Sequence, residues 1–130
     1  MYDPPTPAEL VTAVREFLEE QAMPQLEGRA AFHARVAANA LAIVARQLEL
    51  GPQAETAELT RLRDLLPELL QGQGTLEELN RELCGRIRSG DLDCETPGLA
   101  GHLRRTTLDK LAVDQPKYSG YRRALEQLDE

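Results

Sequence analysis

The chain has 130 residues, with 15 basic and 22 acidic side chains and a formal net charge of −7. Hydrophobic residues make up 42 % and charged residues 28 % of it, which is ordinary for a globular protein and excludes collagen-like and mostly disordered chains. The acidic excess argues against nucleic acid as a partner, because a nucleic-acid binder needs basic side chains to displace counterions. It likewise disfavours an anionic membrane surface, and we expect neither kind of partner.

Targeting signals and ligand clusters are not evident in the sequence. No apolar run reaches the roughly 20 residues of a membrane-spanning helix, and the first seven residues do not resemble a secretory signal. Without such a signal, Cys84 and Cys94 are expected to be reduced thiols, which predicts a cytoplasmic protein. Two cysteines and two scattered histidines show no zinc-ligand spacing, so we predict no metal and no cofactor.

Leu and Ala dominate the hydrophobic residues whereas Val and Ile are scarce, which favours helices over strands. Thr6-Pro7-Ala8-Glu9 is a capping box that opens the first predicted helix. Behind it, Leu10, Val14, Phe17 and Leu18 share one helical face, and the following loop lies between Pro24 and Gly28.

The second predicted helix runs from about Arg29 to Leu50 and stops at Gly51-Pro52. Residues 36–45 are apolar on every side except at Asn39. A helix that is apolar all round is normally enclosed by other helices. We therefore expect this alanine-rich helix to be the centre of the fold.

Further helices are predicted over 53–66, from the Thr75-x-x-Glu78 capping box to Gly90, from Thr96-Pro97 to about Val113, and over 121–128. The expected fold is all-α, a single compact bundle of five to six helices around the central helix at about 29–50. The length predicts one domain over 1–130, with an ordered core at about 6–119.

Asn39 is a polar residue in this predicted central helix, and a helical wheel places it beside Arg35 and Arg46. A buried amide must be hydrogen-bonded, or it costs about 1–3 kcal/mol. One interpretation is that Asn39 bonds a neighbouring backbone and fixes the packing. The other is that Arg35, Asn39 and Arg46 form a polar stripe that holds an anionic ligand.

Lys110 and Asp114 form a second polar anomaly, because the wheel places both inside the apolar arc that contains Leu99 and Leu103. Near a helix end, Lys110 can extend its ammonium to water and pair with Asp114. Alternatively, the two residues form a half-buried ion pair that faces a pocket.

The segment 101–123 is basic, with six basic and two acidic residues and a local charge of +4. It either folds onto the acidic remainder through weak surface pairs or forms a face for an anion or an acidic partner. The candidate partner-binding residues there are Arg104, Arg105, Arg122 and Arg123. No serine nucleophile elbow, phosphate loop or His-Glu-x-x-His motif is present, and we predict no catalytic residues.

Three stretches resemble a small uncharacterised bacterial family: Gly28-Arg-Ala-Ala-Phe-His-Ala-Arg-Val-Ala-Ala-Asn-Ala-Leu41, Leu79-Asn-Arg-Glu-Leu-Cys84 and Leu108-Asp-Lys-Leu-Ala-Val-Asp-Gln-Pro-Lys-Tyr118. The resemblance extends from about Thr6 to Ser119. Members look like single helical domains of unknown function, met beside phosphotransferases similar to aminoglycoside and choline kinases and beside acyl-CoA dehydrogenases. The resemblance implies an accessory role in acyl-CoA or hydroxy-acid catabolism and supplies no catalytic residues.

Two functions are therefore expected. The first is a non-catalytic accessory or interaction domain for a phosphotransferase-like or acyl-CoA dehydrogenase partner, contacted through the basic face or an exposed leucine patch. The alternative is a binding protein, or a weak enzyme, for an anionic metabolite such as an acyl-CoA, with Arg35, Asn39, Arg46, Lys110 and Asp114 at its site. Nine leucines between Leu59 and Leu83 exceed what one small core needs, which favours a homodimer.

Overall fold

The computed structural model describes residues 3–69 and 74–127. Over these residues it contains five α-helices and no strand, which confirms the all-α prediction. The chain divides into two compact units, Met1–Gly51 and Pro52–Glu130, called here the N-terminal and C-terminal units. Helix α2 (Gly28–Leu65) begins in the first unit and ends in the second.

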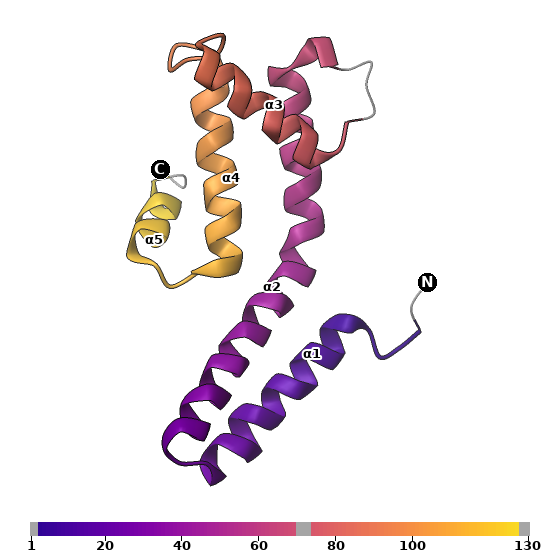
Figure 1. The fold of residues 1–130 in the computed structure, drawn as a ribbon, viewed down its shortest axis with the longest axis vertical. Coiled ribbons are helices and arrows are strands. Elements are labelled where there is room, and N and C mark those ends of the chain that lie inside the picture. The colour runs from indigo at the N-terminus through magenta and orange to yellow at the C-terminus, as the bar shows by residue number, and fades with distance from the viewer. Residues whose placement is uncertain (1–2, 70–73, 128–130) are drawn as a thin grey trace. The chain divides into compact units, whose positions relative to one another are not determined.

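The N-terminal unit is a helical hairpin. Its first helix, α1 (Pro7–Glu16), begins at the predicted capping box: the Thr6 N–H donates to the Glu9 carboxylate at 2.6 Å, and the Glu9 N–H donates to Thr6 Oγ1 at 3.3 Å. A π-helical turn at Phe17–Ala22 and a 3₁₀ turn at Met23–Gln25 follow. They reverse the chain, so that α1 lies beside the first part of α2 (Figure 1).

The predicted stop at Gly51-Pro52 is wrong, because α2 continues through Pro52 as one 38-residue helix. A proline removes one backbone donor and crowds the residue before it. Here that residue is Gly51, whose missing Cβ leaves room that the Gln47 side chain fills. The proline nevertheless marks a real division, since the boundary between the two units falls at this point.

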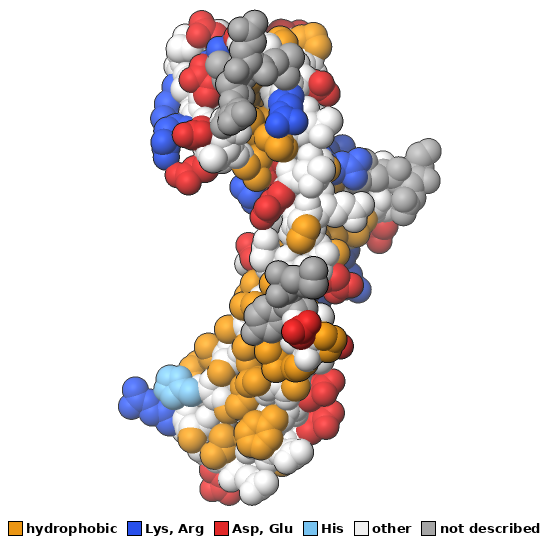
Figure 2. All heavy atoms as spheres, turned by 90° about the vertical axis from the view of Figure 1, so that its right-hand side faces the viewer, with side chains coloured by type: hydrophobic (Ala, Val, Ile, Leu, Met, Phe, Trp, Pro, Cys, Tyr) orange, Lys and Arg blue, Asp and Glu red, His pale blue; other side chains and the backbone are white. Residues whose placement is uncertain are grey.

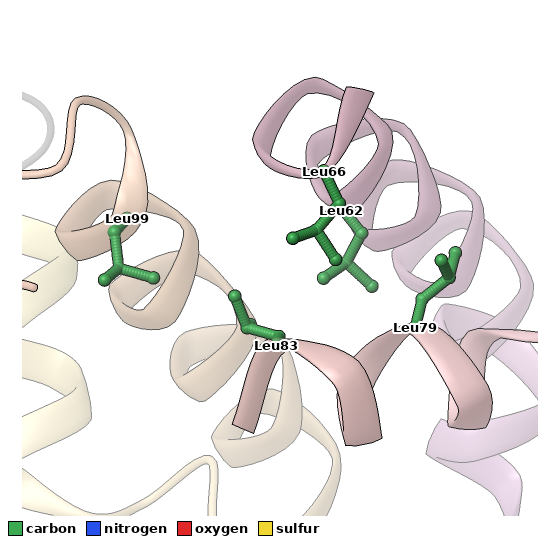
Figure 3. Packing of buried hydrophobic residues seen from close by; sticks show 5 residues of the cluster. All are labelled: Leu62, Leu66, Leu79, Leu83 and Leu99. Atoms are coloured by element: carbon green, nitrogen blue, oxygen red, sulfur yellow. The ribbon is translucent and has the colours of Figure 1, made fainter. Parts of the chain in front are cut away.

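The C-terminal unit is built around leucines. It consists of the last part of α2, a 3₁₀ turn at Pro67–Leu69, α3 (Leu76–Ser89), α4 (Leu99–Asp114) and α5 (Ser119–Glu126). Helix α3 crosses between the end of α2 and the start of α4, and α5 lies beside α4 (Figure 1). The buried core comprises Leu62, Leu66, Leu79, Leu83 and Leu99, which point toward one another in Figure 3.

The helices of this unit keep most of their predicted ends. The Thr75–Glu78 capping box forms, and Gly90 ends α3 in the left-handed conformation with φ of 83°. Helix α5 begins at Ser119, two residues earlier than predicted, and Leu128 lies outside the described residues.

The leucines between Leu59 and Leu83 serve this core. Leu62, Leu66, Leu79 and Leu83 are buried in it, and three others pack against it with part of their surface exposed: Leu59, Leu65 and Leu76. Leu70 and the side chain of Leu69 lie outside what the structure describes. The leucine count therefore gives no support to a dimer through this segment.

The alanine-rich segment 36–45 is not enclosed on every side as predicted. Only Ala38 is buried there, together with Ala34 one turn earlier, whereas Val36, Asn39 and Ile43 are exposed. Among the described residues of the N-terminal unit, α1 is the one α-helix that lies beside this part of α2. The small alanines allow a close approach on one face, and the opposite face keeps its larger side chains in water.

Candidate functional site

The ligand-binding residues predicted in α2 do not form a buried site within the N-terminal unit. Arg35 and Asn39 are exposed, and Arg46 is half-buried. The expectation of a buried Asn39 amide was wrong, because it assumed that the whole circumference of the helix was covered.

Lys110 and Asp114 are also exposed, and no ion pair joins them within the described part of the chain. The predicted apolar arc was misplaced because α4 buries two faces. One carries Leu99 and Val113, and another carries Leu108. Lys110 and Asp114 lie on the exposed strip of helix surface between these two faces, beside Leu103, which is 43 % exposed.

A cluster of polar side chains lies between α2, α3 and α4, and the sequence did not predict it. Glu58 on α2 and His102 on α4 are 8 % and 3 % exposed. Asn80 on α3 donates from Nδ2 to Glu58 Oε1 at 2.8 Å. Arg61 on α2 donates from Nη2 to two oxygens of α4, those of Thr106 at 3.2 Å and Asp109 at 3.4 Å.

His102 is the residue of this cluster whose pKa departs clearly from its ordinary value. Its burial lowers the pKa of the imidazole, the positive charge of Arg61 lowers it further, and the negative charge of Glu58 opposes both effects. Its Nδ1 is buried and has no hydrogen-bond partner among the described residues. The folded protein therefore favours the neutral imidazole.

The hydrogen bonds of this polar cluster link α2 to both α3 and α4. An imidazole that is 3 % exposed has no access to a substrate in this conformation. A sequence signal for the cluster did exist: Leu99, His102, Thr106, Asp109 and Val113 follow a three-four spacing along one face of α4. Three polar residues in that stripe hid it from a search for apolar periodicity.

A groove of about 430 Å³ lies between α4 and α5. Its walls are mainly apolar, and Arg104 is the one basic residue among those that line it. The guanidinium of Arg104 donates to Gln127 Oε1 at 3.3 Å, a neutral acceptor. Of the four predicted partner-binding residues, all exposed, Arg104 thus has a defined place at the groove; the others are Arg105, Arg122 and Arg123.

The hairpin exposes an unusual amount of apolar surface. Figure 2 shows hydrophobic side chains gathered on one face of residues 3–51, in the lower part of the view. Among the described residues of this unit, ten large hydrophobic side chains are exposed, and the buried hydrophobic ones are Ala34 and Ala38. The ten are Leu10, Val14, Phe17, Leu26, Phe32, Val36, Ile43, Val44, Leu48 and Leu50.

The part of the chain that the structure covers shows neither a metal-ion site nor a membrane-spanning helix. Within 3–69 and 74–127, no three His, Cys, Asp or Glu side chains come close enough to hold a metal ion. Cys84 and Cys94 are free and exposed. None of the described helices combines the length and the apolar character that crossing a bilayer requires.

These features define an all-α protein made of a helical hairpin and a leucine-cored helical unit. The chain belongs to the family described as Domain of unknown function (DUF6285), whose model matches residues 24–118, more than half of the chain. This confirms the resemblance to an uncharacterised family, and the matched range takes in residues of both units. Searches of curated proteins and of solved structures gave no match.

Proposed function

We propose that this protein is a non-catalytic accessory module that works by binding other protein chains. The observation that carries the proposal is the hairpin, which buries two alanines and exposes ten large hydrophobic side chains. A contiguous exposed apolar patch of more than a few hundred Å² is typical of interaction surfaces. A helical hairpin gains little from its own packing and is stabilised by whatever covers that patch.

The basic residues of the C-terminal unit supply a second surface, suited to an acidic partner. Arg104, Arg105, Arg122 and Arg123 are exposed on α4 and α5. Arginine forms paired hydrogen bonds with carboxylates, so such residues recognise acidic surfaces well. The partners we propose are a phosphotransferase-like protein or an acyl-CoA dehydrogenase in acyl-CoA or hydroxy-acid catabolism, with the protein acting in the cytoplasm of a bacterium.

The test is direct binding between the purified chain and purified proteins of these two classes from the same organism, measured by calorimetry at low and at high salt. We expect a complex that weakens as salt rises, because screened charges attract less. The double variant Arg122→Glu/Arg123→Glu should weaken it, whereas Arg63→Glu, an exposed arginine on α2, is the matched control. No measurable complex with either class at low salt would contradict the proposed partners.

A second candidate function is binding of an anionic amphiphilic metabolite, such as an acyl-CoA, and the groove between α4 and α5 favours it. Its volume of about 430 Å³ lies in the range of small-molecule sites, and Arg104 adds a positive charge to its mainly apolar lining. A ligand should raise the melting temperature in proportion to the logarithm of its concentration above Kd. Arg104→Gln should abolish that shift, and a screen of CoA esters without any shift would exclude this function.

A further inference from the structure

Helix α2 has two apolar faces within the N-terminal unit, and only one of them is covered there. Ala34 and Ala38 are buried, and they share their side of the helix with half-buried Leu41 and Ala45. At 100° per residue, the nearly opposite side carries an exposed set of side chains. This set, called the α2 stripe, consists of Phe32, Val36, Asn39, Ile43 and Leu50.

The α2 stripe has the spacing of a coiled-coil seam. Its members follow one another at intervals of four, three, four and seven residues, so they occupy alternating a and d positions of a heptad. Arg46, half-buried, occupies the remaining d position. The four hydrophobic members are between 36 % and 62 % exposed. In coiled coils a seam with this spacing is covered by a second helix.

We propose that the α2 stripe pairs with the α2 stripe of a second copy of this chain, in antiparallel orientation. In antiparallel seams an a position packs against a d position of the other helix. This alignment places Phe32 against Leu50 of the second copy, and Ile43 against Asn39 of the second copy. The inference rests on the proposed interaction function, and it names one of the partners.

Charges beside the stripe fit this orientation. Arg35 and Glu49 occupy g positions at the two ends of the seam, and antiparallel pairing brings g positions of the two helices together. Both residues are exposed, and neither forms an ion pair in the part of the chain that is described. Arg35 of each copy therefore meets Glu49 of the other, which gives two equivalent pairs. Between them, Ala42 lies opposite itself and leaves room for a close approach.

The size of the surface also suits a second copy. A standard interface buries about 800 Å² on each partner. The four hydrophobic members of the α2 stripe form the apolar centre of such an area, and exposed polar residues beside them, Arg35 and Glu49 among them, belong to its rim. Contact of identical patches closes as a symmetric dimer, in which the two α2 helices form the central pair and each α1 lies on the outer side of its own α2.

The first experiment is sedimentation equilibrium of the full chain under reducing conditions. We expect a species of twice 14.4 kDa at micromolar concentration. Ile43→Glu should raise the dimer Kd by roughly a hundredfold, since it places an unpaired charge in the seam. Val44→Glu is the matched control, because Val44 is a neighbouring exposed hydrophobic residue that points about 100° away. A monomer for the natural chain, or equal effects of the two variants, would overturn the proposal.

A charge swap tests the orientation. Arg35→Glu and Glu49→Arg should each weaken the dimer by roughly three- to tenfold, and the double variant should restore it. Weakening without restoration would contradict the antiparallel pairing. Asn39→Leu should tighten the dimer, because it replaces a polar group opposite Ile43 of the second copy; a misfolded variant could not show this gain.

The two proposals fail separately. A chain that is monomeric yet binds a phosphotransferase-like or acyl-CoA dehydrogenase protein keeps the proposed function and loses the dimer. A chain that dimerises through α2 but binds neither class keeps the dimer and loses those partners.

Discussion

The hairpin and the C-terminal unit are both built from α-helices, but the hairpin exposes many of its large apolar side chains and the C-terminal unit buries its leucines. The C-terminal unit buries leucines from three helices, and two of them, Leu62 and Leu66, are 0 % exposed. Among its described residues, the hairpin buries two alanines and exposes ten of its larger apolar side chains. Both units begin a helix with the same capping box, so local helix signals do not separate them. What separates them is whether a third helix covers the apolar face.

The largest expected effect is on the leucine core. Leu62→Ala removes a fully buried side chain and should lower the free energy of unfolding by about 2–5 kcal/mol, measured by urea denaturation. Leu125→Ala, at a site 39 % exposed in the same unit, is the control and should have a much smaller effect. Similar losses for the two variants would mean that the C-terminal unit is not organised around this core.

The next effect concerns the polar cluster. Asn80→Ala removes the donor to the carboxylate of Glu58, a residue that is 8 % exposed, and should lower the free energy of unfolding by about 1–3 kcal/mol. Glu58→Gln keeps an acceptor oxygen for Asn80 and should lose less. If Asn80→Ala has no effect on the urea midpoint, the cluster does not hold α2 and α3 together.

A pH dependence should distinguish the two units. Burial and Arg61 lower the pKa of His102 in the folded state, whereas the unfolded chain has the ordinary value near 6.5. The stabilising contribution of neutral His102 is fully present above about pH 6.5. It is lost as pH falls toward the folded pKa, because the unfolded state then binds a proton that the folded state does not.

This contribution changes by at most about 1.4 kcal/mol per pH unit. It is measured as the slope of unfolding free energy between pH 6.5 and pH 5. His102→Gln should remove that part of the slope, and His33→Gln, which alters an exposed imidazole of the hairpin, is the control. A slope unchanged by His102→Gln would show that other groups govern the acid response.

The smallest expected effect compares the two capping boxes directly. Thr75→Ala should destabilise α3 by about 1 kcal/mol. Thr6→Ala removes the same hydrogen bond from α1 and should speed amide exchange in the hairpin alone. Hydrogen exchange read by mass spectrometry reports each helix separately. Faster exchange in α4 on Thr6→Ala would mean that the two units unfold together.

The sequence predicted the helices well because their signals are local. The capping residues Thr6 and Thr75 and the terminator Gly90 act within one turn, and each appears where expected. Pro52 misled the prediction, because a single missing donor did not stop a helix with glycine before it.

The candidate sites were harder to predict, because burial depends on which helices meet. The helical wheel for α2 assumed that other helices surround it on all sides, and Asn39 was therefore predicted to be buried, whereas it is exposed. The wheel for α4 assumed one buried face, which hid His102 and misplaced Lys110. No spacing along one helix reveals how many neighbours it has.

The two cysteines have a practical consequence. Cys84 and Cys94 are both solvent-accessible thiols of the C-terminal unit, and the hairpin contains no sulfhydryl group. A thiol-reactive dye therefore labels only the leucine-cored half of the molecule. For the same reason, any intermolecular disulfide formed in air would join two molecules through that half, and a band of doubled mass on a non-reducing gel would say nothing about α2.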